Sequence, residues 1–416
     1  MATSVCVFED KDYKNLLPLA FRKPVYDLRC GILSIRDKYL ELLDNGALYF
    51  MCRDYLEETQ RAIHGENRIN SLPGNDILFI NGRVIPDEEF INSLLSLKSE
   101  IIIKSKDTDT IVAAFVKHSS IKKISYDEEK LPLFDSLGIS DNDRMTVSEI
   151  LYPWDLINKN SDELIKDFSI LYKKEANTVK DINTGRIELI KPENIFIGKG
   201  TSIKPFTVID ASDGPIYIGE NVTILSHTSV EGPVFIGDGS TVQMHSSVYH
   251  NTSVGRVCKI GGEVVASIIH SYSNKQHEGF LGHSYLGSWV NLGASTNNSN
   301  LKNNYGTVRL TVNGKEMDSG SLFLGLIMAD HSKCSINTMF NTGTVVGAFC
   351  NIFGAGFPQK YIPSFTWGGV EDSVTYDIDK AIYTAQTVSS RRKVKLTDAD
   401  IKLIRKIFDI TKHERQ

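Results

Sequence analysis

The sequence predicts an α/β domain joined to a parallel β-helix, and two observations carry that prediction. Of 31 glycines, only seven precede residue 191, and the other 24 lie between residues 191 and 375. In that same stretch apolar residues recur at every sixth position, a period that neither an α-helix nor a simple strand produces. We therefore predict an α/β domain over residues 1–190, a left-handed β-helix over 191–375 and a helical tail over 376–416.

The six-residue period is unbroken over eight successive positions. One hexad supplies a short strand and a turn, and three hexads complete one triangular coil. The apolar residue of each hexad points inward, and a small residue four positions later fits the tight corner. A less regular run continues at Phe280, Leu286 and Leu292, and then near Ile336. The eight regular positions are Ile218, Ile224, Val230, Ile236, Val242, Val248, Val254 and Ile260.

The first half mixes strand-like apolar runs with helical patterns, as α/β domains do. A helical link into the β-helix is expected near residues 148–175, and the basic end of the chain suits an amphipathic helix. Because each coil of a β-helix contacts mainly its neighbours, we expect residues 191–416, cut from the chain near residue 190, to fold without the first domain. The expected strands are 5–8, 77–80, 101–103 and 111–115, and the expected helices are 34–43 and 86–97.

Charge and composition exclude several classes of protein. Lys and Arg number 46 against 51 Asp and Glu, so the net charge is −5 and no global basic field exists to hold nucleic acid. No apolar run reaches the length of a membrane span, and the N-terminus lacks the features of a signal peptide. The six scattered cysteines contain no CxxC pair and are typical of reduced thiols. We expect a cytoplasmic protein that binds neither nucleic acid nor membrane.

Motifs in both halves carry a resemblance to a known family. Residues 282–287, Gly-His-Ser-Tyr-Leu-Gly, and 290–296, Val-Asn-Leu-Gly-Ala-Ser-Thr, resemble the acetyl-transfer motifs of the bifunctional enzymes that make UDP-N-acetylglucosamine. Residues 324–331, Leu-Gly-Leu-Ile-Met-Ala-Asp-His, resemble archaeal-type members. Near the N-terminus, residues 16–19, Leu-Leu-Pro-Leu, and 22–25, Arg-Lys-Pro-Val, resemble a variant first domain of bacterial relatives.

The resemblance implies a Rossmann-like nucleotidyltransferase domain and an acyltransferase β-helix. In that family the β-helix acetylates glucosamine-1-phosphate from acetyl-CoA, and the first domain transfers a nucleotidyl group from a nucleoside triphosphate. The expected partners are therefore a sugar-1-phosphate, a nucleoside triphosphate, acetyl-CoA and Mg²⁺. Related acetyltransferases bind CoA in the cleft between neighbouring β-helices, so a homotrimer is expected.

His283 is the first candidate for the general base of acetyl transfer, because a histidine titrates near the working pH. His331, in Asp330-His331, is the second candidate. The family match makes Tyr285 and Asn291 candidate sugar-phosphate ligands and places Ala294 against the coenzyme. The spacing of His283 and Tyr285 is one residue shorter than in the family, and Ser295 replaces a glycine. Residues 297–323 break the hexads and include a hairpin at 308–315; this arm offers the candidate ligands Lys302, Asn304, Tyr305 and Lys315.

The first domain departs from the family at its phosphate-binding loop. No glycine stands among residues 1–30, whereas the family's loop uses glycines to bring backbone N–H groups to phosphates. Side chains must then bind phosphate, and the candidates are Arg22, Lys23 and Arg29. Glu9 or Asp10 is the candidate Mg²⁺ ligand, while Arg83 stands where the family has a metal-binding aspartate. The alternative is a non-catalytic first domain that senses a nucleotide sugar or serves as a scaffold.

Three histidines suggest a lesser alternative. His227 and His245 are eighteen residues apart, one full coil, and His250 follows closely. Three imidazoles and a water can bind Zn²⁺ tetrahedrally, as in carbonic anhydrases built on a β-helix.

Overall fold

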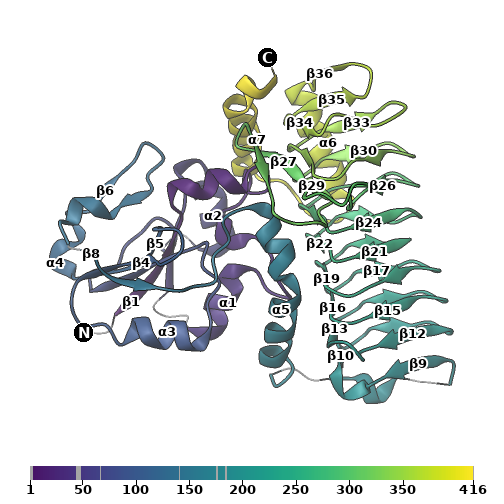
Figure 1. The fold of residues 1–416 in the computed structure, drawn as a ribbon, viewed down its shortest axis with the longest axis horizontal. Helices are drawn as coiled ribbons and strands as arrows, with labels where there is room; N and C mark the ends of the chain where they lie inside the picture. The colour runs from purple at the N-terminus through teal and green to yellow at the C-terminus, as the bar shows by residue number, and fades with distance from the viewer. Residues whose placement is uncertain are drawn as a thin grey trace.

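The computed structural model confirms the predicted architecture of an α/β domain beside a parallel β-helix (Figure 1). It describes residues 3–43, 48–65, 67–139, 141–174, 177–182 and 185–415. The first domain packs against one long face of the β-helix, and helix α5 (Pro153–Leu171) runs between them (Figure 1). Among the described residues no helix is long and apolar enough to cross a membrane.

A six-stranded mixed sheet forms the centre of the first domain. Strands β2, β1 and β3 run parallel, whereas β5 lies antiparallel to both β3 and β4. Helices α1 (Ile35–Leu42), α2 (Glu57–His64), α3 (Glu88–Leu95) and α4 (His118–Ile121) surround the sheet. The strand order is β2 (Leu48–Met51), β1 (Ser4–Phe8), β3 (Ile77–Asn81), β5 (Ile111–Val116), β4 (Ile101–Ser105) and β8 (Asp141–Met145), and a small hairpin pairs β6 (Ser125–Tyr126) with β7 (Pro132–Leu133).

The β-helix has three faces, each a ladder of short parallel strands. The face toward the first domain is one continuous nine-stranded sheet. Its strands are β10 (Ile195–Ile197), β13 (Ile216–Ile218), β16 (Val234–Ile236), β19 (Thr252–Val254), β22 (Ile268–Ile269), β25 (Tyr285–Leu286), β29 (Leu326–Met328), β32 (Thr344–Val346) and β34 (Tyr361–Ile362).

The other two faces are interrupted ladders. The second comprises β11 (Ser202–Ile203), β14 (Thr223–Ile224), β17 (Thr241–Val242), β20 (Lys259–Ile260) and β23 (Asn274–Lys275), then β30 (Lys333–Cys334), β33 (Asn351–Phe353), β35 (Thr366–Gly369) and β36 (Ser373–Thr375). The third comprises β9 (Ile187–Ile190), β12 (Thr207–Asp210), β15 (Ser229–Glu231), β18 (Ser247–Val248), β21 (Glu263–Val265) and β24 (Phe280–Gly282), then β26 (Asn297–Asn298) and β31 (Met339–Phe340).

The hexad prediction is confirmed where the period is regular and fails where it is not. All eight regular positions, from Ile218 to Ile260, are 0% exposed inside the coil. Later, Leu281 takes the inward position in place of the half-buried Phe280. Ile336 is 66% exposed, and Cys334 points inward instead. Because the turns change length along the β-helix, positions counted at six-residue intervals no longer coincide with the inward-pointing residues.

The chain leaves the coil as an arm after β26 and returns to it at β29, and the predicted hairpin within the arm is present. Strands β27 (Arg309–Val312) and β28 (Lys315–Asp318) pair antiparallel. The two turn residues, Asn313 and Gly314, have φ values of 47° and 72°. Positive φ at both positions is the type I′ turn that an Asn-Gly pair favours.

Aromatic side chains stack along one corner of the β-helix. The rings follow the order Tyr272, Trp289, His331, Phe349 and Phe365, and each of these residues has a φ between 59° and 65°. Repetition of one left-handed corner conformation on successive coils places the rings above one another. His331 lies within this stack, 2% exposed, and neither ring nitrogen has a hydrogen-bond partner.

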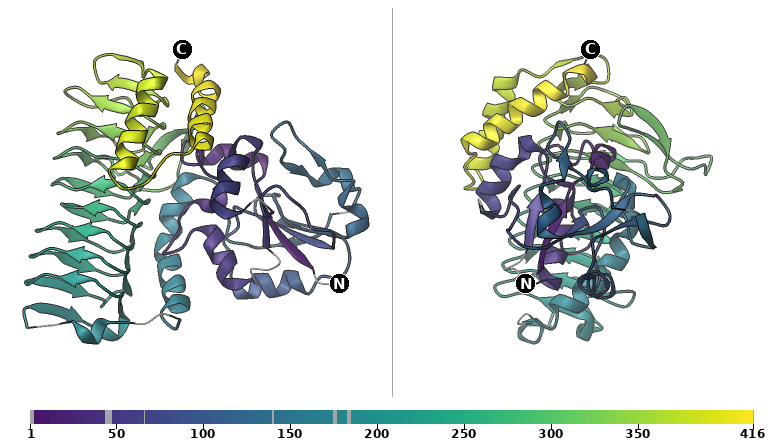
Figure 2. Two further views of the ribbon diagram at one scale, coloured as in Figure 1. Left: turned by 180° about the vertical axis from the view of Figure 1, so that it is seen from behind. Right: turned by 90° about the vertical axis from the view of Figure 1, so that its left-hand side faces the viewer.

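The C-terminal helices join the two domains. Helix α6 (Ile378–Ser390) and helix α7 (Asp398–Ile410) cover one end of the β-helix, and α7 also contacts α2 of the first domain (Figure 2). One hydrophobic core contains residues of both domains, with Tyr26 and Leu28 from the first and Tyr285 and Ile327 from the β-helix. This shared core argues against the expectation that residues 191–416 fold without the first domain.

We predict that residues 191–416, produced alone, aggregate or bind a hydrophobic dye, whereas the full chain does not. The cut uncovers the apolar nine-stranded face that the first domain buries, and apolar patches of that kind promote association. Size-exclusion chromatography and dye fluorescence measure the difference. A monodisperse fragment with a cooperative thermal transition would contradict the shared core.

We predict that His331→Phe raises the melting temperature and weakens acid denaturation. Burial lowers the pKa of His331 well below its ordinary value, so the folded protein keeps the ring neutral while the unfolded chain protonates it as pH falls below about 6.5. Each such group costs about 1.4 kcal/mol of stability per pH unit in that range, and phenylalanine removes this cost. Urea unfolding measured from pH 7 to pH 5 gives the free energy of unfolding at each pH. The same dependence of that free energy on pH in the wild type and in His331→Phe would refute the prediction.

Candidate functional site

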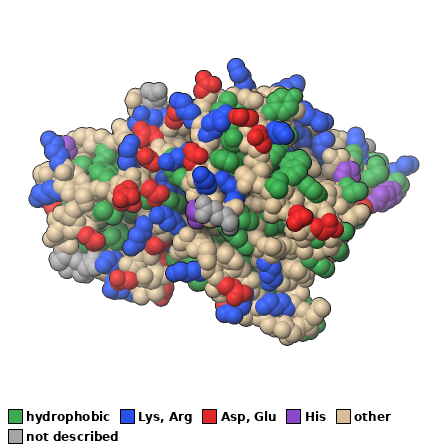
Figure 3. Space-filling view, turned by 90° about the horizontal axis from the view of Figure 1, so that it is seen from above, with side chains coloured by type: hydrophobic (Ala, Val, Ile, Leu, Met, Phe, Trp, Pro, Cys, Tyr) green, Lys and Arg blue, Asp and Glu red, His purple; other side chains and the backbone are tan. Residues whose placement is uncertain are grey.

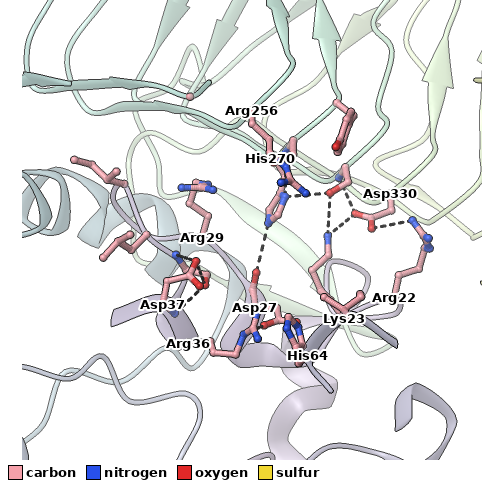
Figure 4. Close-up of a pocket in the computed structure, with 18 of the residues that line it drawn as sticks. Arg22, Lys23, Asp27, Arg29, Arg36, Asp37, His64, Arg256, His270 and Asp330 are labelled. Atoms are coloured by element: carbon pink, nitrogen blue, oxygen red, sulfur yellow. Dashed lines mark hydrogen bonds and ion pairs between the residues drawn. The ribbon is translucent and has the colours of Figure 1, made fainter. Parts of the chain in front are cut away.

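A cavity of about 700 Å³ lies between the two domains, within the size range of small-molecule sites. The first domain lines one side through the 3₁₀ helix η2 (Val25–Asp27), its flanks and helices α1 and α2. Coils of the β-helix line the other side, and Asp400 and Leu403 of α7 contribute to the wall. Figure 4 shows arginine, lysine and histidine side chains from both domains meeting in this cavity.

The carboxylates near these cations already have partners. Asp330 of the β-helix lies 2.9 Å from Lys23 Nζ and 3.5 Å from Arg22 Nη1, and Asp400 lies 3.7 Å from Arg22 Nη2. Asp27 pairs with Arg36 Nε at 2.7 Å. The predicted phosphate ligands Arg22 and Lys23 therefore line the cavity, but they also join the first domain to the β-helix.

Two further arginines of the cavity, Arg29 and Arg256, differ from these paired cations, because no described carboxylate forms an ion pair with either. Arg29, from the first domain, lies over the Phe235 ring at 5.1 Å, and its buried Nε donates to no group. Burial lowers the pKa of its guanidinium. Arg256, from the β-helix, lies over the Tyr272 ring at 5.5 Å and is exposed. Arg29 and Arg256 are thus the two lining Lys or Arg side chains that have no ion-pair partner among the described residues.

His270 stands among these cations as a neutral hydrogen-bond donor. Burial, together with Lys23, Arg29 and Arg256, lowers its pKa well below the ordinary value. Its Nδ1 accepts a hydrogen bond from the Ser271 N–H at 3.1 Å, so the proton of the neutral ring lies on Nε2. Nε2 is 3.4 Å from the Asp27 carbonyl oxygen (Figure 4).

Flat rings form part of the cavity wall. Tyr272 and Trp289 stack with centroids 4.3 Å apart and an interplanar angle of 3°. Phe235 and Tyr217 lie on a neighbouring stretch of the same β-helix face. A ring or sugar can pack against such surfaces while the arginines bind an attached anion.

Ion pairs fill the carboxyl ends of the parallel strands in the first domain. Glu9 follows β1, and its carboxylate accepts from Arg53 Nε at 3.1 Å with both side chains fully buried. Burial raises the pKa of Glu9, and Arg53 opposes that shift. Asp10 pairs with Arg83 Nη2 at 2.6 Å and accepts from Asn81 Nδ2 at 2.7 Å.

This arrangement does not fit a Mg²⁺ site. Both carboxylate oxygens of Asp10 are engaged by Arg83, and those of Glu9 by Arg53 and backbone N–H groups. A hard divalent cation needs several free oxygen ligands. In the part of the chain that the structure describes, no group of three or more His, Cys, Asp or Glu residues is placed to hold a metal ion.

His283, the first candidate base, lies at a corner of the β-helix where the arm leaves it. Its ring stacks on Phe323 at 5.1 Å, and Nδ1 is 2.9 Å from Asn300 Nδ2. Burial, and to a lesser degree His250, lowers its pKa to about 4. The ring is half-buried, and its Nε2 is not enclosed by the protein without a hydrogen-bond partner. His283 is thus neutral at physiological pH and has one nitrogen open.

The structure does not bring the other candidates of acetyl transfer to His283. His331 is enclosed in the aromatic stack, and Tyr285 is fully buried at the domain boundary, where its hydroxyl accepts from the Arg29 N–H at 3.0 Å. Asn291 is exposed on the second face and accepts from Asn274 at 3.3 Å. Ala294 is half-buried, and its carbonyl accepts from the Asn337 N–H.

The arm candidates make mostly local contacts. Lys302 Nζ donates to the Thr307 carbonyl oxygen, and Asn304 accepts from the Gly306 N–H at 3.1 Å. Tyr305 is 71% exposed, and Lys315 is exposed on β28. All four side chains, or parts of them, face solvent rather than a shared cavity.

The three histidines of the zinc alternative do not form a metal site. His227 and His245 stack face to face at 5.0 Å with an interplanar angle of 7°, and Phe206 stacks on His227 in the same way. Imidazoles that bind one ion direct nitrogen lone pairs at a common point, which parallel stacked rings do not. This geometry contradicts the zinc hypothesis.

Sequence reasoning missed the β-helix half of the cavity. Arg256, His270, Tyr272 and Trp289 lie in ordinary hexads, and nothing local marks them as functional. The one available signal was the left-handed corner position, where large aromatic residues recur on successive coils.

Comparison with known proteins agrees with this architecture. Residues 5–176 match the family described as sugar nucleotidyl transferase. The bifunctional sugar-1-phosphate nucleotidylyltransferase/acetyltransferase of Sulfurisphaera tokodaii is 34% identical over 97 residues, 23% of this chain and 24% of that protein. The bifunctional protein GlmU of Methanocaldococcus jannaschii is 31% identical over 126 residues, 30% of each chain.

Among solved structures, the UDP-N-acetylglucosamine acyltransferase of Francisella novicida is 16% identical. That alignment covers 55% of this chain and 84% of the other, with a TM-score of 0.29. The chain spans 24% and 30% of the length of the two curated relatives described above. The first domain is therefore similar to the sugar nucleotidyltransferases, and part of the chain is similar to the bifunctional nucleotidyltransferase–acetyltransferases.

Proposed function

We propose that this chain is a transferase of nucleotide-sugar synthesis whose β-helix moves an acetyl group from acetyl-CoA to a sugar-1-phosphate such as glucosamine-1-phosphate. The observation that carries the proposal is the placement of His283. This residue lies in the family-like motif at residues 282–287, and its neutral ring sits beside the arm with one nitrogen open. The distant bifunctional relatives support the same chemistry.

The reaction needs an amine lone pair to attack the thioester carbonyl carbon. His283 accepts the proton that the amine loses as the new C–N bond forms, and CoA leaves as the thiolate that takes up a proton. A neutral imidazole is competent for this step, and burial keeps the ring neutral. Tyr285 and His331 are too enclosed for direct contact with this substrate, so His283 is the base that we propose. Lys302, Lys315 and Ala294 remain proposed contacts for phosphate and coenzyme.

Asn300 positions the proposed base. Where its amide N–H donates to Nδ1, the neutral ring carries its proton on Nε2 and has no lone pair there. Where the amide presents its oxygen instead, Nδ1 holds the proton and Nε2 is free to accept one. The proposed mechanism uses this second orientation, which needs only a rotation of the side-chain amide.

For the first domain, two functions compete. Transfer of a nucleotidyl group to the sugar-1-phosphate, with Mg²⁺, is the function implied by the family. Binding of a nucleotide sugar without transfer is the second, and the ion pairs Glu9–Arg53 and Asp10–Arg83 favour it because they occupy the groups that a metal needs. Pyrophosphate release from each nucleoside triphosphate with glucosamine-1-phosphate and Mg²⁺ distinguishes the two.

We also propose a homotrimer. Figure 3 shows hydrophobic and histidine side chains at the edge of the β-helix that lies far from the first domain. Phe206 and Met244 on the β-helix are each 56% exposed. Contact between three such β-helices buries these side chains and provides a cleft for CoA.

We predict that His283→Ala lowers the rate of acetyl transfer by about 10²–10⁴ while assembly and melting temperature change little. The assay follows CoA release from acetyl-CoA with glucosamine-1-phosphate. His118→Ala, at an exposed position of helix α4 in the first domain, is the matched control and should keep full activity. Retained activity in His283→Ala would refute the base assignment.

We predict that protonation of His283 lowers the rate of acetyl transfer only when the pH falls to about 4. The base form of His283 exists above its pKa of about 4, so activity falls as pH decreases through that value. In Asn300→Asp a carboxylate faces Nδ1 and stabilises the imidazolium, so this acid limb moves to higher pH. The ammonium group of the substrate sets a separate limb that the substitution leaves in place. An unchanged acid limb in Asn300→Asp would contradict the role given to Asn300.

A further inference from the structure

The cavity between the domains has the features of a binding site that neither domain forms alone. Arg29 and Lys23 enter it from the first domain, Arg256 and His270 enter from the β-helix, and α7 completes the wall (Figure 4). We propose that this cavity binds a nucleoside diphosphate or its sugar ester, with the diphosphate held between Arg29 and Arg256. The substrate class rests on the proposed function, whereas the site itself rests on the geometry.

The distribution of charge supports an anionic ligand. The carboxylates Asp27, Asp330 and Asp400 pair with cations of the cavity, and Glu41 pairs with Lys174 outside it. Asp37 and Asp238 accept hydrogen bonds from the Ser34 hydroxyl and the Glu220 N–H instead of forming an ion pair among the described residues. Arg29 and Arg256 likewise have no ion-pair partner among the described residues, so both guanidinium groups are available to an anion. Two guanidinium groups match the oxygens of a diphosphate better than a single point charge does.

Arg29 is costly to the protein without a ligand. Its Nε is buried and unpartnered; the Phe235 ring at 5.1 Å and the charge of the nearby Asp37 carboxylate compensate it only in part, and burial still lowers its pKa. A partly buried charge without a direct ion pair destabilises the folded state. A ligand anion removes that cost, which explains why an arginine stands at this position.

The rings define the second half of the ligand. Phe235, Tyr217 and the Tyr272–Trp289 stack offer flat surfaces on the same side of the cavity as Arg256. A nucleobase or sugar ring packs on such surfaces, and a volume of about 700 Å³ leaves room for both a ring and a diphosphate.

The site binds its ligand without phosphoryl transfer. Asp27 and Asp330 are occupied by Arg36 and Lys23, the Nδ1 lone pair of His270 accepts from Ser271, and no group of three or more metal-binding side chains is found among the described residues. Since the ligand contacts cations from both domains, its binding favours the docked arrangement of the two. The site is therefore suited to sense a nucleotide product and to hold the domains together.

Binding is tested on the full chain by thermal melting and calorimetry with UDP, ADP, uridine and inorganic pyrophosphate. We expect both nucleoside diphosphates to raise the melting temperature more than uridine or pyrophosphate does, because each of the latter fills only half of the site. The difference between the shifts caused by UDP and by ADP shows whether the site distinguishes the two nucleobases. Absence of any shift with all four probes would overturn the proposal.

Three substitutions separate a binding role from a structural role. Arg256→Gln and Arg29→Met should each weaken UDP binding by about tenfold or more, since a charge-assisted hydrogen bond is lost. Arg29→Met should also raise the melting temperature of the ligand-free protein, because it removes the unpartnered charge. Arg186→Gln, at an exposed arginine just before β9, is the control and should change neither quantity. Unchanged UDP affinity in both Arg29→Met and Arg256→Gln would refute the site.

The acetyl-transfer assay on the same wild-type preparation distinguishes this inference from the proposed function. A protein that binds UDP through Arg29 and Arg256 but transfers no acetyl group supports the site and refutes the proposed function. A protein that transfers acetyl groups but binds none of the four probes refutes the site alone.

Discussion

The docking of the first domain onto the nine-stranded face depends on a buried polar network around Gly31. Asp167 of α5 accepts from the Ile32 and Leu33 N–H groups at 2.9 and 3.0 Å and pairs with Lys38. Gly31 has a φ of +93°, and a Cβ there would lie 2.4 Å from Asp167 Oδ2, so only glycine fits. Asn160 accepts from the Gly31 N–H, and Ser253 of the β-helix donates to the Gly31 carbonyl. This network fixes the chain that carries Arg22, Lys23 and Arg29 against the β-helix.

That placement changes the chemistry of the first domain. Lys23 and Arg22 turn toward Asp330 of the β-helix, and the strand ends are left to internal pairs such as Glu9–Arg53. A fully buried pair is poor evidence of added stability, but loss of one partner is costly, so such pairs are hard to reopen for a metal or phosphate. In the docked arrangement the charged side chains at the strand ends are therefore paired within the domain, and its cations Arg22, Lys23 and Arg29 line the cavity between the domains instead.

The sequence predicted the repeats well because their information is local. Ile218, Ile236 and Val254 stack 18 residues apart, but the next two inward residues of this face follow after 15 and 17 residues. No six-residue period predicts these shorter coils, and the arm that follows them shifts the register again, so Cys334 and not Ile336 points inward. The cavity was less accessible still, since Arg29 and Arg256 come together only through docking. The basic segment at residues 22–29 could be predicted as a candidate anion-binding segment, but the residues of the β-helix that face it across the cavity could not.

The two candidate sites differ in how their charges are compensated, and this difference bears on their roles. At His283 the ring is neutral, stacked on Phe323 and paired with Asn300, so its arrangement is stable without a ligand. In the cavity Arg29 carries a charge that the described residues leave without a carboxylate partner. A base must be ready before each turnover, whereas a sensing site gains from being incomplete, because the ligand then contributes binding energy that the empty protein lacks. A cavity completed only by its ligand, and lined by both domains, links nucleotide binding to the arrangement of the whole chain.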